Sequence, residues 1–196
     1  MLGVLITVEG LDGAGKTTLI EGLAAALDPV VVLREPGGVE VAERIRALLA
    51  DPALDVDPRA EALLYAAARA QLVAQALRPL LAGGATVLLD RFVDSSLAYQ
   101  GAGRGLGVEE IRALNAFGTG GLVPDRTLLL RIDPVAGLAR ISGRPADRLE
   151  QAGAEFFAAV AAAYDELAAA EPERFVVLDA SQPPDAVLAE ALAHLQ

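Results

Sequence analysis

The stretch GLDGAGKT at residues 10–17 has residue types and a spacing that indicate chemistry. It fits the pattern G-x-x-x-x-G-K-[ST] and lies between an apolar run and a helical pattern, which is the context the pattern requires. Glycines let successive backbone N–H groups face one concavity, and with a helix N-terminus these groups bind phosphate. The stretch therefore predicts a nucleoside triphosphate site.

Lys16 supports this interpretation because it is the only lysine among 16 basic residues, and all the others are arginine. A compact ammonium on a flexible stem reaches over the glycine-rich loop to the β- and γ-phosphates, where a planar guanidinium does not fit. The hydroxyl of Thr17 is the expected Mg²⁺ ligand. The residues expected to bind ATP are Gly10, Leu11, Asp12, Gly13, Ala14, Gly15, Lys16, Thr17 and Thr18.

A phosphate loop alone does not separate a switch GTPase from a phosphotransferase. GTPases read guanine with an Asn-Lys-x-Asp motif, which would need a second lysine, and the chain has none. It also lacks an Asp-x-x-Gly switch element outside the loop. An ATPase motor would need partner surfaces and additional domains, and we find neither in these 196 residues. The sequence favours a phosphotransferase.

Bulk composition narrows the class of partner. The net charge of −11 argues against binding along a nucleic acid backbone. No apolar run approaches the length needed to cross a bilayer, and the first residues lack the basic segment of a signal peptide. With no cysteine there are no disulfides or thiolate metal sites. We expect a cytoplasmic protein without nucleic acid or membrane partners.

The elements that must position the phosphate loop follow from short apolar runs alternating with helical patterns, an arrangement typical of a parallel sheet covered on both faces. We expect one α/β domain over residues 1–196, built on a five-stranded parallel sheet flanked by helices. The expected strands are 4–8, 30–33, 86–90, 127–132 and 175–179. The expected helices are 16–27, 40–50, 58–82, 108–117 and one after residue 185, with a loop at 101–107 and further helices flanking a polar break at 142–150.

Several motifs occur in one order along the chain: EGLDGAGKTT, REPGG, YAAARAQL, DRFVDSSLAYQG, PDRTLLL, ADRLE and FVVLDASQPPDAV. Together they resemble bacterial thymidylate kinase, a nucleoside monophosphate kinase of the P-loop phosphotransferases, from residue 4 to about 190. REPGG and DRF…S…AYQG are specific to that family. The resemblance implies a homodimer that moves a phosphoryl group from ATP–Mg²⁺ to dTMP by direct in-line transfer, yielding dTDP for dTTP synthesis.

Asp90 and Arg91 end an expected strand, so they should face the phosphate loop across the edge where ligands bind. By resemblance, Arg91 holds the acceptor phosphate, and Asp90 supports the metal together with Thr17. Asp12 is a candidate for the sugar 3′-hydroxyl and for catalysis. Without the neighbouring motif, Asp90 and Arg91 could equally be an ion pair at a strand end.

REPGG closes the second expected strand at the same edge. The resemblance places Arg34 and Glu35 near the reaction centre and Pro36 against the base. Arg34 is the favoured second cation, because two anionic nucleotides require more than one fixed positive charge. The turn itself needs no function.

The base and sugar are assigned to the helices. Tyr65 and Arg69 share a helix face by their spacing; by resemblance, Tyr65 stacks on thymine and Arg69 binds its O4. Ser96 would lie near the base edge, Tyr99 would fill the space of a ribose 2′-hydroxyl, and Gln100 belongs to the same pocket. On spacing alone, Tyr65 and Arg69 could be an ordinary core and surface pair.

The segment around 142–150 is expected to close over the transferring phosphoryl group as a lid. Arg140, Arg144 and Arg148 place three cations in nine residues of an acidic protein. By resemblance they supply the clamp on the phosphoryl group, since the variable loop positions carry no basic residue. Arg144 is the first choice, and the choice between Arg144 and Arg140 stays open, as does the role of Arg131.

Two other activities remain as alternatives. A different nucleoside monophosphate kinase would act on dUMP or CMP, and a deoxynucleoside kinase would act on a neutral sugar hydroxyl. The latter needs a carboxylate base beside the acceptor. A nucleotide-binding protein without catalysis is a third possibility, and an assay across monophosphates and nucleosides separates all of these.

Overall fold

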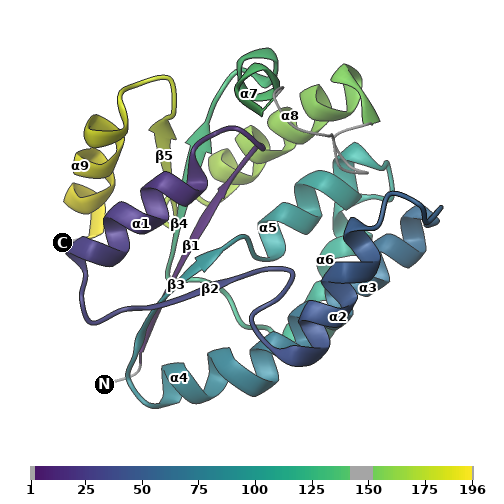
Figure 1. The fold of residues 1–196 in the computed structure, drawn as a ribbon, viewed down its shortest axis with the longest axis horizontal. Coiled ribbons are helices and arrows are strands. Elements are labelled where there is room, and N and C mark those ends of the chain that lie inside the picture. Colours follow the sequence, from purple (N-terminus) through teal and green to yellow (C-terminus); the bar gives the residue numbers. More distant parts are fainter. Residues whose placement is uncertain (1–2, 142–151, 196) are drawn as a thin grey trace.

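A sheet of five strands forms the centre of the molecule (Figure 1). The computed structural model describes residues 3–141 and 152–195. All neighbouring strands pair in parallel in the order β2-β3-β1-β4-β5, which confirms the predicted five-stranded parallel sheet. The strands are β1 (Val4–Gly10), β2 (Val31–Arg34), β3 (Thr86–Asp90), β4 (Arg126–Arg131) and β5 (Phe175–Asp179).

Helices connect consecutive strands and cover both faces of the sheet. The α-helices are α1 (Lys16–Ala26), α2 (Glu40–Ala50), α3 (Pro58–Leu72), α4 (Arg78–Ala82), α5 (Val93–Ser96), α6 (Val108–Thr119), α7 (Pro134–Ile141), α8 (Ala154–Ala170) and α9 (Pro184–Leu195). Two π-helical segments, η1 (Val73–Leu77) and η2 (Leu97–Gly103), continue α3 and α5. Helix α3 begins at Pro58, where the expected helix 58–82 begins, and the carboxylate of its N-cap, Asp57, accepts from two backbone N–H groups.

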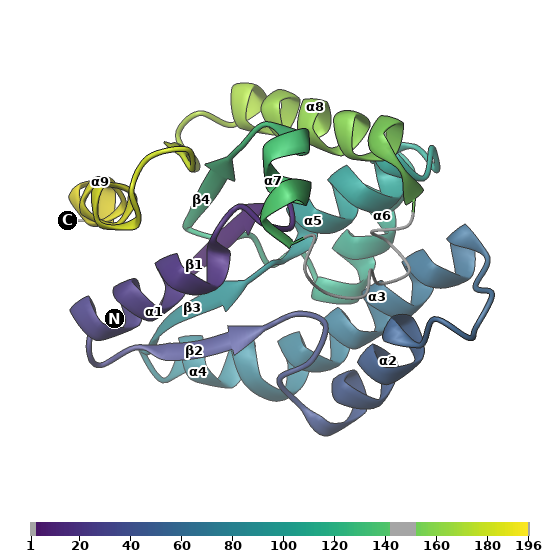
Figure 2. The same ribbon diagram turned by 45° about the horizontal axis from the view of Figure 1, so that its top comes forward.

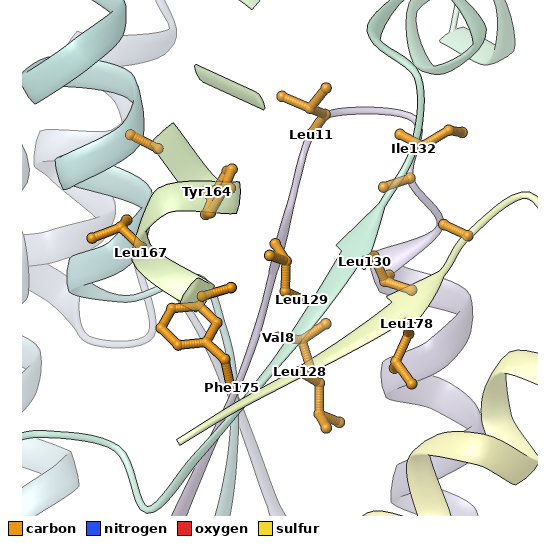
Figure 3. Packing of buried hydrophobic residues seen from close by; sticks show 14 of the residues in the cluster. Val8, Leu11, Leu128, Leu129, Leu130, Ile132, Tyr164, Leu167, Phe175 and Leu178 are labelled. Atoms are coloured by element: carbon orange, nitrogen blue, oxygen red, sulfur yellow. The ribbon is translucent and has the colours of Figure 1, made fainter. Parts of the chain in front are cut away.

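Side-chain alternation along the strands builds a core on each face. Helices α1 and α9 pack on one face, and α8 packs against β4 and β5 on the other (Figure 2). On β4, Leu128 and Leu130 point to the first face, whereas Leu129 points to the second, beside Tyr164 and Phe175 (Figure 3). These side chains are almost fully buried, so β4 is covered on both of its faces.

Several elements begin or end one or two residues from the predicted bounds, and three differences bear on the site. Strand β1 runs on to Gly10, because Glu9 and Gly10 pair with β4. The expected helix at 58–82 contains the π-helical η1. The loop expected at 101–107 begins only after Gly103, because Leu97, Ala98 and Tyr99 are buried and keep that segment helical.

The strand register brings three connecting segments to one edge. Asp90 at the end of β3 pairs with Val8 of β1 and with Arg34 of β2. The carboxyl ends of these strands therefore meet, as expected where an open parallel sheet binds a ligand. The phosphate loop, REPGG and Arg91 all follow from this edge. The predicted lid segment, 142–150, with Arg144 and Arg148, lies outside the described residues. Within the described residues, no helix combines the length and apolarity needed to cross a bilayer.

Candidate active site

The glycine-rich loop takes a backbone course that requires its glycines. Gly13 and Gly15 have φ of 80° and 94°, in the left-handed region. A Cβ on Gly13 would lie 2.1 Å from the carbonyl oxygen of Gly137 in α7. Only glycine allows this approach, which holds the loop against the helix that leads to the predicted lid. Helix α1 begins at Lys16, directly after the loop.

Lys16 is folded back over the loop. Its Nζ donates to the carbonyl oxygens of Leu11 and Gly10 at 2.9 and 3.2 Å and lies 3.7 Å from Oδ1 of Asp12. Burial, reinforced by the positive charge of Arg91, lowers the pKa of Lys16 to about 8. Anionic phosphates in the loop would oppose this shift and keep the ammonium charged.

Arg91 turns back across the same edge. Its backbone φ is 66°, and its guanidinium donates from Nη2 to Oδ1 of Asp12 at 2.6 Å. Nη1 donates to the carbonyl of Gly10 and to Oγ of Ser95, both at 3.1 Å. The guanidinium also lies over the ring of Tyr99, 5.0 Å from its centroid. Arg91 and Lys16 thus place two cations beside one loop.

Asp12 balances these cations. Burial acts to raise the pKa of its carboxyl, but the charges of Arg91 and Lys16 outweigh burial and lower it. Oδ2 of Asp12 also accepts from the phenol of Tyr99 at 3.4 Å. The carboxylate is therefore ionised at neutral pH and helps to fix the orientation of Arg91.

A cavity of about 180 Å³ opens beside Arg91 and Asp12. Its walls come from the REPGG turn, from α2 and α3, and from α5 with η2. Nearly all of the predicted acceptor pocket gathers here. The lining residues are Asp12, Glu35, Pro36, Arg46, Leu49, Ala50, Tyr65, Arg69, Arg91, Ser95, Ser96, Tyr99 and Gln100.

Arg69 is almost fully buried at the floor of this cavity and donates to both walls. Nε binds Oε2 of Glu35 at 2.6 Å, and Nη2 binds the carbonyl of Phe92 at 2.8 Å. Nη1 binds Oγ of Ser96 at 2.9 Å and Oδ1 of Asn115. Four donated bonds fix the guanidinium plane before any ligand arrives. Asn115 was not predicted, because its position in the middle of α6 gives no sequence signal.

Glu35 is buried with its partner. Burial raises the pKa of Glu35 to about 7, although the adjacent Arg69 acts in the opposite direction. Its Oε1 is buried and has no hydrogen-bond partner among the described residues. A ligand or ordered water at the cavity would satisfy this oxygen.

Gln100 and Tyr99, both from η2, also line the cavity. The amide nitrogen of Gln100 donates to Oε1 of Glu61 at 3.0 Å, so the amide oxygen is its remaining acceptor. Glu61 is buried and also pairs with Arg104 at 3.1 Å. The ring of Tyr99 packs edge-on against the ring of Phe156, and this contact restricts the orientation of Tyr99.

Arg34 is not brought into the cavity. Its Nη2 donates to both carboxylate oxygens of Glu43 at 2.8 and 3.0 Å, and its side chain is 53% exposed. Instead, Arg46 of α2 lines the cavity and donates to the carbonyl of Pro36 at 2.9 Å. Arg46 was missed because it is one of several charged residues on an amphipathic helix.

Glu9 is another residue that the sequence analysis did not single out. It is fully buried at the end of β1, where it accepts from Oγ of Ser95 at 2.5 Å and from the phenol of Tyr164 at 2.9 Å. A charged residue inside the apolar run VLITVEG was the available signal. Arg131, for which the sequence gave no role, pairs with Asp165 of α8 at 2.9 Å.

Arg140, at the end of α7, bridges the glycine-rich loop and the segment that follows β5. Its Nη1 and Nη2 both donate to the carbonyl of Ala180 at 3.1 Å, and Nη1 lies 3.4 Å from the carbonyl of Gly13. Thr17 and Thr18 are exposed in the first turn of α1. Oδ1 of Asp90 is buried and has no partner within the described part of the chain.

Comparisons with known proteins agree with this geometry. The family model described as "Thymidylate kinase" matches residues 8–191. A thymidylate kinase of Deinococcus radiodurans is 51% identical, covering 97% of this chain and 95% of that protein. One from Lactobacillus delbrueckii subsp. bulgaricus is 47% identical, covering 98% of this chain and 95% of that protein.

A solved structure shares the fold. The crystal structure of thymidylate kinase from Ehrlichia chaffeensis superposes with a TM-score of 0.82 and 31% sequence identity, covering 100% of both chains. The family model and these relatives each span nearly the whole chain. The chain therefore belongs to the thymidylate kinase family, whose enzymes phosphorylate dTMP to dTDP.

Proposed function

We propose that this thymidylate kinase binds dTMP in the cavity between Arg69 and Arg91 and phosphorylates it to dTDP by direct in-line transfer from ATP–Mg²⁺ held on the phosphate loop. The observation that carries this proposal is the pair of cations, Lys16 and Arg91, that contact one loop, where Arg91 also lines the cavity. Repulsion between two anionic nucleotides is the main obstacle, and fixed cations reduce it.

The hydrogen-bonding groups at the cavity floor match the edge of thymine. Arg69 has one hydrogen on Nη2 beyond the bond to Phe92, which suits the O4 acceptor. Gln100 presents its amide oxygen, which suits the N3–H donor. Cytosine reverses both groups, so the same pair disfavours dCMP. Tyr65 would stack on the base, and Tyr99 would occupy the space of a 2′-hydroxyl.

The acceptor phosphate would replace Asp12 as the partner of Arg91. The 2.6 Å ion pair between Asp12 and Arg91 holds the guanidinium at the loop, within reach of a phosphate placed against the γ-phosphate. Asp12, freed from that bond, can accept from the sugar 3′-hydroxyl. No strong general base is required, since the acceptor phosphate oxygen is already ionised near neutral pH.

The residues present fit an ATP-bound Mg²⁺. Thr17 exposes its hydroxyl at the start of α1, and the unpartnered Oδ1 of Asp90 can accept from metal-bound water. Magnesium keeps several waters and needs few protein ligands; accordingly, no cluster of three acidic or histidine ligands occurs among the described residues. When bound, the ion would neutralise charge on the transferring phosphoryl group.

Arg140 and the predicted lid would complete the donor side. Arg140 already contacts the carbonyl of Gly13, so it lies next to the loop that holds the triphosphate. Arg144 and Arg148 follow within the predicted lid and are proposed to clamp the γ-phosphate. Closure of that segment would exclude water and limit ATP hydrolysis.

A homodimer is the proposed assembly. Helix α3 packs against both α2 and α6, and all three carry exposed apolar side chains. Phe117 of α6 is 91% exposed, and Leu63 of α3 is 57% exposed. A second copy of the chain could cover this surface. Light scattering should report twice the mass of 20.2 kDa, and Phe117→Glu should shift it to the monomer mass.

The test of the reaction is a coupled ADP-release assay with ATP–Mg²⁺ and a panel of acceptors. The proposal expects dTMP to have the highest kcat/KM, dCMP to be poor, and thymidine, which lacks the acceptor phosphate, to be inert. Phosphorylation of thymidine, or equal use of dCMP, would overturn it.

A further inference from the structure

The carboxylate of Glu9 is buried and has no direct ion-pair partner among the described residues. It is completely shielded from solvent at the end of β1, one residue before the phosphate loop. Burying a charge without a partner is costly unless hydrogen bonds compensate. Burial, reinforced by the nearby charge of Asp94, raises the pKa of Glu9. Such a residue invites a functional explanation.

The hydrogen bonds of Glu9 connect it to the backbone that follows Arg91 and, through Ser95, to the guanidinium of Arg91. Oε1 accepts from the backbone N–H of Phe92, the next residue in the chain, at 2.7 Å. Oε2 accepts from Oγ of Ser95 at 2.5 Å, and the same Oγ accepts from Nη1 of Arg91 at 3.1 Å. One carboxylate therefore holds the peptide that follows Arg91 and, through Ser95, its guanidinium.

Glu9 makes these hydrogen bonds next to a strained backbone position, Arg91. Among the described residues, Arg91 is the one non-glycine residue with a positive φ, 66°. The left-handed conformation is unfavourable for a residue with a Cβ and persists only where surrounding contacts impose it. The contacts here are Arg91 N–H to Val8 O at 3.0 Å and Phe92 N–H to Glu9. This turn carries Arg91 from the end of β3 back over Gly10.

The carbonyl group of Phe92 is bound by Arg69, which lines the cavity. Arg69 donates to the carbonyl of Phe92, whose own N–H is bound by Glu9. Phe92 itself is fully buried. Tyr164 of α8 adds a second hydroxyl on Oε2 of Glu9, at 2.9 Å, and packs edge-on against Tyr99. The acceptor site is thus fixed to β1 and to α8 through one carboxylate.

We propose that Glu9 is a positioning residue for the acceptor phosphate, acting through the Phe92 peptide and Ser95 to hold the guanidinium of Arg91 over the phosphate loop. Glu9 does not touch a substrate in this role. The inference rests on the proposed function, in which Arg91 binds the phosphate of dTMP.

The role predicts a selective defect in Glu9→Gln. The amide matches the carboxylate in size and can still accept from Phe92 N–H, but its NH₂ group would donate to Ser95 and compete there with Arg91. Affinity for dTMP should fall about tenfold or more, the value of a charge-assisted bond. Affinity for thymidine, which has no phosphate to meet Arg91, should stay within about twofold.

Calorimetric titration of dTMP and of thymidine into the full-length protein measures both affinities. The readout is the ratio of the dissociation constant of thymidine to that of dTMP, which Glu9→Gln should lower. Asp94→Asn is the control for loss of a neighbouring buried carboxylate: Asp94 binds Arg174, at 2.6 and 3.0 Å, and acts on Glu9 only through its negative charge, whose removal favours the ionised form of Glu9. The control should lower the melting temperature and leave the ratio unchanged.

The possible results distinguish a failure of the proposed function from a failure of the role of Glu9. A wild-type ratio near one, or a ratio unaffected by Arg91→Met, would overturn the proposed function and this inference with it. A large wild-type ratio that Glu9→Gln leaves intact, or an equal loss for both ligands, would overturn the role of Glu9 alone. If Glu9→Gln does not fold, Ser95→Ala decides: removing the hydroxyl link should lower the ratio several-fold, and an unchanged ratio would refute the role.

Discussion

Replacing Arg69 by methionine tests how the acceptor pocket is held together. Arg69 is 2% exposed and donates to Glu35, Ser96, Asn115 and the carbonyl of Phe92. Removing it leaves the Glu35 carboxylate buried without its cation. Breaking a buried ion pair from one side costs about 3–5 kcal/mol. For a chain of this length the expected fall in melting temperature is roughly 6–20 °C.

The destabilisation caused by Arg69→Met should depend on pH, because Glu35 titrates. Its pKa in the folded protein is about 7, above the ordinary value of 4.5, so the folded state keeps a proton that the unfolded state has lost. Wild-type stability from this group therefore falls as pH rises between those values and is constant above them. Without Arg69, which lowers the pKa, the fall continues to higher pH. The destabilisation by Arg69→Met should be larger at pH 8.5 than at pH 6.

Urea unfolding followed by circular dichroism at both pH values measures this effect. Arg44→Met, which breaks an exposed pair with Glu40, is the control and should change little at either pH. Adding Glu35→Gln to Arg69→Met should restore part of the loss at pH 8.5. A destabilisation equal at the two pH values, or no rescue by the second substitution, would refute the reasoning.

Three further predictions concern turnover. Lys16→Ala should reduce kcat to background while the thermal melt stays close to wild type; normal kcat would refute the assignment of the phosphate loop. Tyr99→Ala should raise kcat/KM for the ribonucleotide of thymine relative to dTMP by about tenfold, and an unchanged preference would show that Tyr99 does not exclude the 2′-hydroxyl. Arg144→Gln should lower kcat far more than it raises the KM for dTMP, and the reverse pattern would make Arg144 a binding residue.

Local patterns predicted the sheet and the glycine-rich turn between β1 and α1. The five apolar runs are short and bounded by turns, and their parallel pairing follows from the helices between them. The glycine spacing and Lys16 are contiguous in sequence, so no tertiary information was needed to place the loop. The helical segment 93–103 was missed because its first residues, VDSS, form a single turn without a clear period.

Partners distant in sequence could not be predicted. Arg69 binds Glu35, 34 positions away, and Glu9 binds Ser95, 86 positions away. The sequence suggested Arg34 as a second cation for the acceptor, whereas its guanidinium pairs with Glu43 outside the cavity. Which of several arginines reaches a site depends on helix packing, and a single sequence does not encode that in a local pattern.

The most direct test of the central claim, that two nucleotides are held end to end across Lys16 and Arg91, is the affinity for one molecule in which adenosine and thymidine are joined through their 5′-oxygens by a polyphosphate chain. Linking two occupied sites raises affinity well above that of either nucleotide, by about a hundredfold or more. Calorimetry should show this gain in the wild type and a large loss of it in Arg91→Met. Binding no tighter than that of ATP alone would contradict the account.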